Sequence, residues 1–465
     1  MKRDQGDTTQ GVQGPERSQG MTERQDGVWH HRAPMEPNGK TALVLSYQYP
    51  GKYAFTVLAG AVESDPALAD VPIHFPRDRE TLLATLLQCA DEGCTVVGAW
   101  SFYSASFGAA VEELAWVRER LEGRRVLCIA GGVHATAETE QTLRAGFDMV
   151  AVGEGEHLLR ELLHRLKRGE DPKGTRGMAR LEQGRVVQNG RGEGVVELDA
   201  FPPFAARHGK FGAIEITRGC IYACRFCQTP FLNKARFRHR SVRNVAEWAR
   251  VLRGSGRRDV RFITPTSMSY GSADEAVNLA AVEELLAALR EAMGLDGRIF
   301  FGTFPSEVRP EHVTPETLAL LKRYVDNNNL IIGGQSGSER ILQSSHRGHD
   351  TEAVVRAVRV SVEAGFLPNV DFILGMPGEE REDLDATVRL MEQLSELGAR
   401  VHGHTFMPLP GTPYRDAPAG RVDEETQRRL DRLASQGRLY GHWKQQVALA
   451  EQIVQRRQPR ARGRA

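Results

Sequence analysis

Three cysteines lie within eight residues of one another, at Cys220, Cys224 and Cys227, in the segment EITRGCIYACRFCQTP. Thiolates bind metal, and three of them on one short loop can each hold one iron atom of a [4Fe–4S] cubane. No fourth cysteine follows nearby, so one iron atom would keep an open coordination position. The spacing therefore predicts a cluster with one iron that is free to bind a ligand.

Two other interpretations use the same thiols. Zinc could take them together with His239 as a Cys3His site, although zinc motifs usually arrange their ligands as two pairs rather than three and one. The cysteines could also be packing residues, as Cys128 is expected to be in the apolar run RVLCIA. Arg218 and Arg225 make the turn polar, which disfavours packing and leaves the cluster as the favoured prediction.

The segments that must position these thiols alternate between short β-rich runs and amphipathic helical patterns. In the first part of the chain we expect strands at 41–46, 71–75, 95–100, 125–130 and 148–152, with helices at 78–92 and 106–122. Strand–helix alternation of this kind predicts a doubly wound parallel sheet.

A second alternating series begins after a connector that contains one expected hairpin. Its expected strands are 213–217, 260–264, 299–303, 330–334, 370–375 and 401–406, and its expected helices are 242–253, 276–293, 315–326, 351–365 and 381–397. Six consecutive units predict a partial (β/α)6 TIM-like barrel, whose active site lies at the C-terminal ends of the strands. The cysteine loop directly follows the first of these strands.

The chain is thus expected to be an α/β protein of two domains. We expect a disordered tail at 1–39, a sheet domain at 40–170, a connector at 171–208, the barrel at 209–413, and a helical extension with a basic tail at 414–465. The 61 basic and 60 acidic residues give no broad basic face for nucleic acid. Six scattered or clustered cysteines, no signal peptide and no membrane-length apolar run make a cytoplasmic location the expectation.

The cysteine segment resembles the Cys-x3-Cys-x2-Cys signature of the radical S-adenosylmethionine (SAM) superfamily, in which an aromatic residue, here Phe226, precedes the last cysteine. Three later segments, in the family's order, are similar to its motifs on the fourth, fifth and sixth barrel strands: GGQSGSERIL (333–342), DFILGMPGEEREDL (371–384) and FMPLPGTP (406–413). The resemblance covers about 210–413. It implies that the open iron chelates the methionine part of SAM and that reductive cleavage gives a 5′-deoxyadenosyl radical.

The resemblance also implies a set of SAM-binding residues. They are Phe226, Thr264, Gln335, Ser336 and Gly375. One segment departs from the family, because relatives often carry Gly-Gly-Glu after the second barrel strand to hold the methionine amino group. Here that place reads FITPTSMSYG (262–271), and Thr264, Thr266 or Ser267 are the candidate replacements.

The first domain resembles the cobalamin-binding domain that precedes the barrel in one large subgroup of these enzymes. Ser101 follows the third strand, with Tyr103 in place of the leucine of a Ser-x-Leu element, and glycines follow the fourth and fifth strands. A cofactor tail that threads between strand ends needs small residues, because a Cβ would collide with it. The implied cobalamin-binding residues are Ser101, Gly131, Gly132, His134, Gly153, Glu154 and Gly155.

A second departure leaves cobalamin binding open. Cobalamin folds that supply an axial histidine carry Asp-x-His-x-x-Gly in the first strand–helix loop, and the corresponding residues 55–60 read FTVLAG, with Val57 at the histidine position. An aliphatic side chain cannot ligate cobalt, so either cobalamin binds without a protein ligand or the domain no longer binds it. His134 is a candidate replacement ligand or, alternatively, a polar residue that caps the next helix.

Three functional hypotheses follow from these resemblances. The first is a cobalamin-dependent radical SAM methyltransferase that acts on an unactivated carbon or phosphorus of a small molecule and takes electrons from a flavodoxin or ferredoxin. The second is a radical SAM enzyme without functional cobalamin, because 335–338 is similar to a segment of the tRNA methylthiotransferases. The third is a non-catalytic cobalamin- or cluster-binding sensor. No membrane or nucleic-acid partner is expected, and no motif identifies the substrate or a catalytic side chain.

Overall fold

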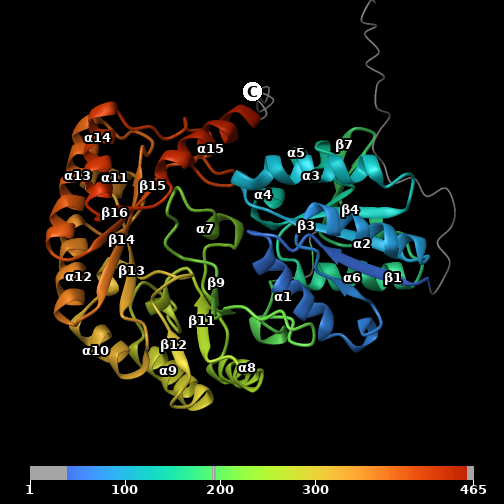
Figure 1. The fold of residues 1–465 in the computed structure, drawn as a ribbon, viewed down its shortest axis with the longest axis horizontal. Helices are drawn as coiled ribbons and strands as arrows, with labels where there is room; N and C mark the ends of the chain where they lie inside the picture. The colour runs from blue at the N-terminus through green and yellow to red at the C-terminus, as the bar shows by residue number, and fades with distance from the viewer. Residues whose placement is uncertain (1–38, 191, 193–194, 458–465) are drawn as a thin grey trace, which may run out of the picture.

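The computed structural model describes residues 39–190, 192 and 195–457, which form two α/β parts side by side (Figure 1). The expected disordered tail at 1–39 lies outside the described residues except for Gly39, and the basic tail lies outside them from residue 458 onward. The expected α/β architecture, with a parallel sheet followed by a partial barrel, is confirmed by the strand connections described next.

The first part is built on a seven-stranded sheet in the order β2-β1-β3-β4-β5-β6-β7. Its strands are β1 (Thr41–Leu45), β2 (Ile73–His74), β3 (Thr95–Ser101), β4 (Val126–Gly131), β5 (Met149–Ala151), β6 (Met178–Glu182) and β7 (Arg185–Gln188). Strands β1 to β5 are parallel, and the connector hairpin β6–β7 adds two antiparallel strands at one edge.

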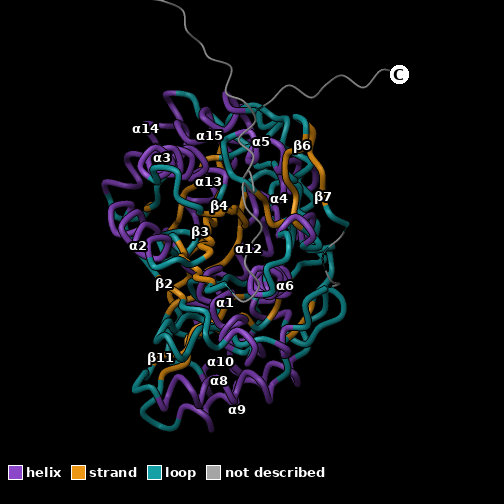
Figure 2. The backbone as a smooth tube through the Cα atoms, turned by 90° about the vertical axis from the view of Figure 1, so that its right-hand side faces the viewer, coloured by secondary structure: helices purple, strands orange, loops and turns teal. Residues whose placement is uncertain are grey.

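Helices cover both faces of this sheet (Figure 2). They are α1 (Lys52–Glu63), α2 (Arg79–Asp91), α3 (Phe107–Arg120), α4 (Gly132–Ala137), α5 (Thr139–Arg144) and α6 (Glu156–Lys167). Leu82 of α2 and Val117 of α3 are buried in the core on one face, whereas Phe55 of α1 and Leu159 of α6 are buried in the core on the other. The sheet is therefore doubly wound, and its strand C-termini remain available for a site.

Residues 55–60 lie in the middle of α1, not in a strand–helix loop as the sequence comparison placed them. Phe55, Ala59 and Val62 recur at helical spacing and are all buried, which explains why the segment is helical. Gly60 has its own packing reason, because a Cβ there would lie 2.7 Å from the backbone oxygen of Phe204. The loop between β1 and α1 ends at Gly51, the N-cap of the helix, so residues 55–60 lie beyond it.

The second part contains the six predicted barrel strands, all parallel. They are β8 (Ile214–Glu215), β11 (Asp259–Ile263), β12 (Arg298–Phe300), β13 (Asn329–Gln335), β14 (Leu367–Leu374) and β15 (Arg400–Thr405). They form the sheets β12-β11-β8 and β13-β14-β15, the second of which is extended by β16 (Leu439–Tyr440). The amide of Ile331 donates to the carbonyl of Gly302 at 3.0 Å where the two sheets adjoin. A short antiparallel ribbon, β9 (Thr217–Arg218) with β10 (Arg238–His239), flanks the cysteine loop.

Helices cover the outside of the barrel strands. They are α8 (Val242–Gly254), α9 (Leu279–Met293), α10 (Pro315–Tyr324), α12 (Thr351–Glu363) and α13 (Arg381–Glu396), with the short α7 (Gln228–Leu232) and α11 (Glu339–Ser344) on the loops. Outward strand residues such as Val370 and Phe372 pack against them in one large core. The intervening strand positions, such as Asp371, face the barrel interior, because successive side chains alternate between the two faces.

The extension expected to be helical at 414–465 also contains a strand, which corrects that expectation. Between α14 (Glu424–Ser435) and α15 (Trp443–Arg456) lies β16 (Leu439–Tyr440), which pairs in parallel with β15. Gly437, at φ +70°, interrupts the helical pattern, and Leu439 is buried in the barrel core. Helix α15 then packs on β15 and runs toward the first part (Figure 1).

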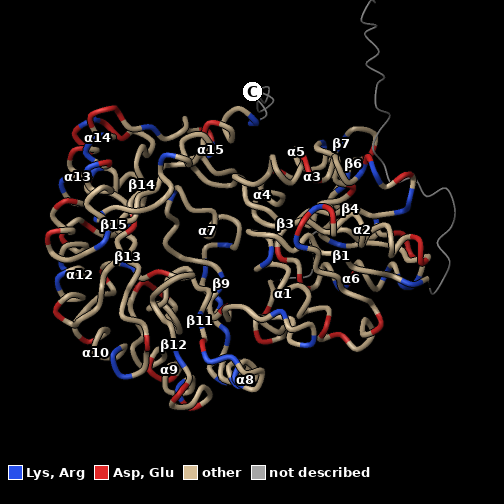
Figure 3. The backbone as a smooth tube through the Cα atoms, viewed as in Figure 1, with Lys and Arg blue, Asp and Glu red and all other residues tan. Residues whose placement is uncertain are grey.

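No helix among the described residues is long and apolar enough to cross a membrane. Basic and acidic residues are interspersed around the outer helices of both parts (Figure 3), as the near-equal numbers of the two charges suggest.

Candidate functional site

The cysteine loop leaves the barrel between β9 and β10 and is fixed by backbone geometry. Gly219, just before the first cysteine, has φ +83°, and a Cβ there would lie 2.1 Å from the carbonyl oxygen of Arg236. The amide of Cys227 donates to the carbonyl of Cys224 at 3.0 Å, and that of Arg225 to the carbonyl of Ser345 at 3.0 Å. The loop is thus folded back on itself and tied to the C-terminal end of α11.

The spread of the three sulfur atoms distinguishes a cluster from a single zinc ion. Thiolates on one tetrahedral zinc ion lie about 3.8 Å apart, because each Zn–S bond is about 2.3 Å long. The sulfur atoms of Cys220, Cys224 and Cys227 are not all within 4.8 Å of one another. His239 is held elsewhere, with Nδ1 3.0 Å from the Thr217 hydroxyl and Nε2 2.9 Å from the Ser272 carbonyl. This geometry disfavours the Cys3His alternative and suits thiolates that bind different irons of a cubane.

Two buried guanidinium groups lie beside the loop. Arg347, 4% exposed, donates from Nη1 to the sulfur of Cys224 at 3.6 Å and from Nη2 to the carbonyl of Gly333 at 2.8 Å. Arg309, 2% exposed, stacks over the ring of Tyr222 at 3.6 Å. Positive charge in a buried site favours the thiolate form over the thiol.

Burial acts in the opposite direction on the free thiols. It raises the pKa of the Cys220 thiol to about 11 and also raises the pKa of the Cys227 thiol. In the metal-free chain these groups therefore hold protons at neutral pH, and metal binding must displace the protons.

Phe226 connects the four motif segments. It packs against a buried apolar cluster of Ile341, Met376 and Phe406, which come from the segments at 333–342, 371–384 and 406–413 respectively. Segments that are far apart in sequence but similar to motifs of one family therefore meet beside the cysteine loop. An apolar wall of this kind can stack against a flat aromatic base.

The segment after β13 holds Gln335 and Ser336 in different ways. Gln335 has φ +70°, a left-handed conformation that is uncommon for a residue with a side chain, and it is 5% exposed. Its amide nitrogen would lie 2.7 Å from a Cβ added at Gly333, so it bends back over the strand end. The Ser336 hydroxyl lies 3.2 Å from that of Thr387 on α13 and accepts the amide of Ser338, so it holds the turn.

Two of the three residues proposed to replace Gly-Gly-Glu use their hydroxyls in hydrogen bonds within the protein. Thr264 donates its hydroxyl to the carbonyl of Thr266 at 3.1 Å, and Ser267 donates to the hydroxyl of Ser306 at 3.2 Å. The Thr266 hydroxyl is buried and has no hydrogen-bond partner. As SAM contacts, these residues stay predictions.

Glu307 and Arg347 are site residues that the sequence analysis missed. A Cβ at Gly333 would lie 2.5 Å from Nη2 of Arg347 and 3.2 Å from Oε2 of Glu307, so both side chains converge where β13 passes the cysteine loop. Burial raises the pKa of Glu307, while the nearby arginines act to lower it. A signal was present, since Glu307 follows the third barrel strand, where barrel sites gather.

Gly375 takes φ +75° at the end of β14, as a glycine-rich turn requires. A Cβ there would lie 2.4 Å from the backbone nitrogen of Arg421, so the close approach in this structure is made by the chain itself. The amides of Gly375 and Met376 both donate to Oε2 of Glu379, and burial raises the pKa of Glu379 to about 7.

A cavity of about 360 Å³ lies at the C-terminal ends of β3, β4 and β5. Six of the seven residues implied for cobalamin line it, namely Ser101, Gly131, Gly132, Gly153, Glu154 and Gly155. Residues of the second part close its other side, among them Glu215, Arg218 and Ile263. The cavity therefore lies between the two parts.

The cavity wall formed by α1 is apolar. Val57 and Leu58 line it, with Tyr53 one turn earlier. No histidine lines the cavity among the residues that the structure describes. Val57, which stands at the histidine position of the cobalamin motif in the sequence analysis, thus faces the cavity.

His134 is not brought to this cavity. It is 4% exposed, stacks on Phe107 with ring centroids 4.3 Å apart, and places Nδ1 3.0 Å from the Ser104 hydroxyl. Burial lowers its pKa to about 4. It lies within α4 rather than capping a helix, and it lines a separate, small hollow with Pro408 and Arg415.

Glu154 joins the two parts. It pairs with Arg238 of β10, lies 3.6 Å from Arg218 of β9, and accepts the amide of Val196 at 2.9 Å. Burial alone would raise its pKa, but these contacts lower it. Its carboxylate therefore links the cavity wall of the first part to the β9–β10 ribbon that flanks the cysteine loop.

The comparisons with known proteins agree with this layout. A family described as the radical SAM superfamily matches residues 214–391. A tRNA-2-methylthio-N(6)-dimethylallyladenosine synthase of Shewanella denitrificans is 29% identical over 58% of this chain and 58% of its own length. A protein of Pyrococcus horikoshii described as an uncharacterized methyltransferase is 28% identical over 62% of each chain. The chain thus spans about three fifths of these two relatives.

Two solved structures share the arrangement of both parts. The radical SAM methyltransferase TsrM of Kitasatospora setae, solved with tryptophan and a SAM analogue, has a TM-score of 0.63 and 20% identity, covering 81% of this chain and 75% of its own. The cobalamin-dependent SAM radical enzyme OxsB, solved with aqua-cobalamin, has a TM-score of 0.61 and 16% identity, covering 76% and 52%. At these identities the likeness shows the fold.

Proposed function

The chain belongs to the radical SAM superfamily, and from this premise we propose that it is a cobalamin-associated radical SAM methyltransferase acting on a small molecule. The observation that carries the proposal is the cavity between the parts. Arg218 lines that cavity and stands two residues before Cys220, so a ligand in the cavity and a cluster on the cysteine loop would face a common space. A substrate held there would reach both cofactors.

A cluster bound here would supply one electron to the sulfonium of SAM, whose C–S bond would break to give methionine and a 5′-deoxyadenosyl radical. Cys220, Cys224 and Cys227 hold three irons in this proposal, and Arg347 stabilises the thiolate of Cys224. Phe226 and Met376 offer an apolar wall for adenine.

Glu307 is the residue we propose for the methionine amino group. It is an acidic side chain that converges with Arg347 where β13 passes the loop. A carboxylate suits an ammonium group, and the adjacent guanidinium suits the carboxylate of the same ligand. Glu307, which follows the third barrel strand, would thus bind the amino group that the Gly-Gly-Glu segment after the second strand binds in relatives.

Cobalamin, if bound in the cavity, would supply a cobalt centre that can carry the methyl group. The cavity residues fit such a ligand, because Gly131 and Gly132 leave the strand end open and Val57 and Tyr53 present an apolar wall. Since no histidine lines the cavity among the described residues, we propose that cobalamin binds without a nitrogen ligand from the protein. A flavodoxin or ferredoxin is the proposed electron donor.

Methylthiotransferase activity is the second candidate, because relatives with that description match the chain. Such chemistry would need a second cluster on the first part. Cys89 on α2 and Cys128 in the middle of β4 are both buried in the packed core of the first part, so these two thiols are packing residues and do not lie on an open loop. This placement disfavours the candidate.

One experiment separates these proposals. Anaerobically reconstituted protein should hold about four irons per chain, release 5′-deoxyadenosine from SAM when reduced, and retain cobalamin with a shifted absorption spectrum. Two irons or fewer, or stoichiometric zinc, would refute the cluster. An intact cluster and SAM cleavage without cobalamin retention would instead favour a radical enzyme that has lost the corrin.

A further inference from the structure

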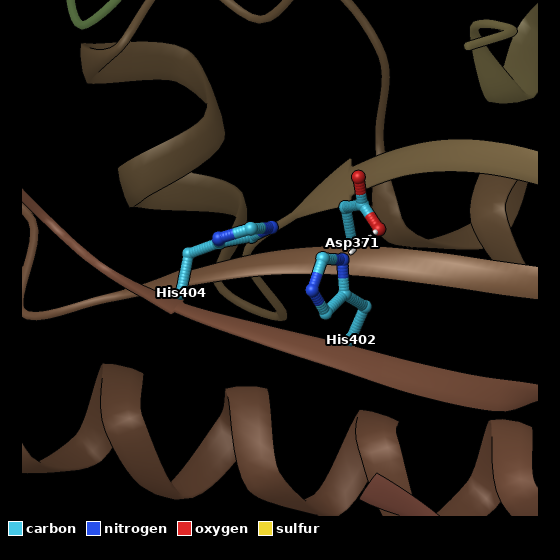
Figure 4. Close-up of side chains that lie close together, drawn as sticks. All are labelled: Asp371, His402 and His404. Atoms are coloured by element: carbon cyan, nitrogen blue, oxygen red, sulfur yellow. Dashed lines mark hydrogen bonds and ion pairs between the residues drawn. The ribbon is translucent and has the colours of Figure 1, made fainter. Parts of the chain in front are cut away.

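We propose that Asp371, His402 and His404 form a second metal site, inside the barrel, for one divalent transition-metal ion such as Zn²⁺ or Fe²⁺. The three side chains come from the adjacent strands β14 and β15 (Figure 4). Their ligand atoms all lie within 4.8 Å of one another. Nothing in the proposed function uses these residues.

Strand register explains why the three side chains meet. Asp371 is the direct partner of His402 in the parallel pair β14–β15, so their side chains emerge together. His404 lies two residues further along β15 and therefore points to the same face. That face is the barrel interior, because Val370 and Val401, which precede Asp371 and His402 and point the opposite way, are buried in the outer core.

The ligand types match a known preference. Two imidazoles and one carboxylate with open positions suit zinc and ferrous iron, which take imidazole nitrogens and carboxylate oxygens about 2.0–2.2 Å away. On a tetrahedral ion such ligand atoms lie about 3.3–3.6 Å apart, so the three side chains, whose ligand atoms now lie within 4.8 Å of one another, would move closer together on binding. His402 Nδ1 and Asp371 Oδ1 are already 3.0 Å apart, with the imidazole N–H donating to the carboxylate.

Neighbouring side chains hold the two imidazoles in place. The ring of Tyr440 stacks on His402, with centroids 4.5 Å apart and planes 8° apart, and its hydroxyl donates to Asn369 at 3.3 Å. The Gln446 amide lies 3.3 Å from Nδ1 of His404, which leaves Nε2 directed toward Asp371 (Figure 4). Outer contacts of this kind orient metal-binding histidines.

The surroundings of His404 can also hold its ring proton. Ligation through Nε2 places the ring proton on Nδ1, where the oxygen of Gln446 can accept it once the amide turns over. At present that oxygen accepts the amide of Thr405 at 2.8 Å.

The site remains accessible from the barrel interior. The side chain of Asp371 is 17% exposed and that of His402 is 26% exposed. A bound ion would therefore keep at least one position open for an oxygen or nitrogen donor of a small molecule. The charge of Asp371 also acts on Glu307, which connects the site electrostatically to the surroundings of the cysteine loop.

The test uses cluster-loaded protein without a histidine tag, so that the three cysteines cannot take the added metal. Zn²⁺ is added, the excess is removed by desalting, and zinc and iron are counted per chain. We expect one zinc ion with the cluster iron unchanged. The X-ray absorption spectrum at the zinc K edge should show only nitrogen and oxygen neighbours at about 2.0–2.2 Å, without sulfur at about 2.3 Å.

Variants locate the ion. Asp371→Asn, which keeps the shape of the side chain, and His404→Gln should each lose at least nine tenths of the zinc, and Gln446→Leu should weaken binding. His239→Gln is the matched control, because His239 is also half-buried and hydrogen-bonded but lies outside the group. The cluster iron in each variant reports its folding.

Three results would overturn the site: no zinc retained by the wild type, sulfur in the zinc coordination shell, or equal retention by Asp371→Asn, His404→Gln and His239→Gln. The cluster iron and 5′-deoxyadenosine release are measured separately. A failure here is therefore distinguishable from a failure of the proposed radical SAM function.

Discussion

The cysteine loop and the cavity of the first part are built by opposite means. The loop carries thiols and charged groups whose chemistry is specific, and Arg347 and Phe226 tie it to distant segments of the barrel. The cavity is defined by what is missing, since glycines and Ser101 leave room and Val57 offers no ligand atom. A site made of reactive side chains can therefore be predicted from the sequence, whereas a ligand cavity is recognised only in the folded structure.

The largest effect is expected from Cys224→Ala, which tests whether the cysteine loop and the cavity act as independent sites. The side chain is 5% exposed and accepts a hydrogen bond from Arg347, so its loss removes one proposed iron ligand and the sulfur that Arg347 contacts. We expect 5′-deoxyadenosine release to fall below detection, while cobalamin retention, measured by its absorption on the desalted protein, stays unchanged. Loss of both would mean that the two sites are not independent.

Glu307→Gln tests whether Glu307 binds the amino group of SAM beside the cysteine loop. If the carboxylate holds the methionine amino group, loss of one charge-assisted hydrogen bond, worth about 1.5–3 kcal/mol, raises the KM for SAM roughly 10- to 100-fold. Iron content should not change. Glu316→Gln makes the same charge change in the first turn of α10, outside the barrel, and should leave the KM alone. An unchanged KM in Glu307→Gln would return the role to the region of Thr266.

The cavity is tested by a pair of glycines with similar backbone conformations. Gly132 has φ +91° and Gly153 has φ +95°, so alanine costs similar strain at both. A Cβ at Gly132 would lie 2.9 Å from the hydroxyl of Ser101, whereas one at Gly153 meets nothing within 4 Å. Gly132→Ala should weaken cobalamin binding roughly tenfold, as overpacking costs about 1–3 kcal/mol, and Gly153→Ala should weaken it less. Equal effects would show that strain, not space, controls binding.

The same contrast explains how much the sequence could predict. Strand and helix periodicity located the barrel strands and the doubly wound sheet, because local patterning and burial agree there. The cysteine positions and the meeting of Phe226 with three later segments were predictable from motif order.

Contacts made across the fold were not predictable. Residues 55–60 are helical because their apolar residues face the sheet, and Gly60 is explained by the passing backbone of Phe204. Nothing in the sequence around His134 shows that the ring is buried against Phe107, nor that His402 and Asp371 share a strand register. These features depend on which strands become neighbours, information that periodicity does not carry.

The smallest expected effect concerns Glu379, whose carboxylate accepts two backbone amides at the turn after β14. Burial raises its pKa from 4.5 to about 7 in the folded chain, so the folded state favours the protonated form. Its contribution to stability is fully present below pH 4.5 and is lost as the pH rises to about 7. Glu379→Gln keeps an acceptor oxygen for the amides but cannot ionise, so the loss should disappear. We expect the difference in Tm, wild type minus variant, to decrease as the pH rises from 5 to 7.5. The decrease should be roughly 2–4 °C for each kcal/mol of stability that the wild type loses. A pH-independent difference would show that Glu379 titrates normally and that the turn is open to water.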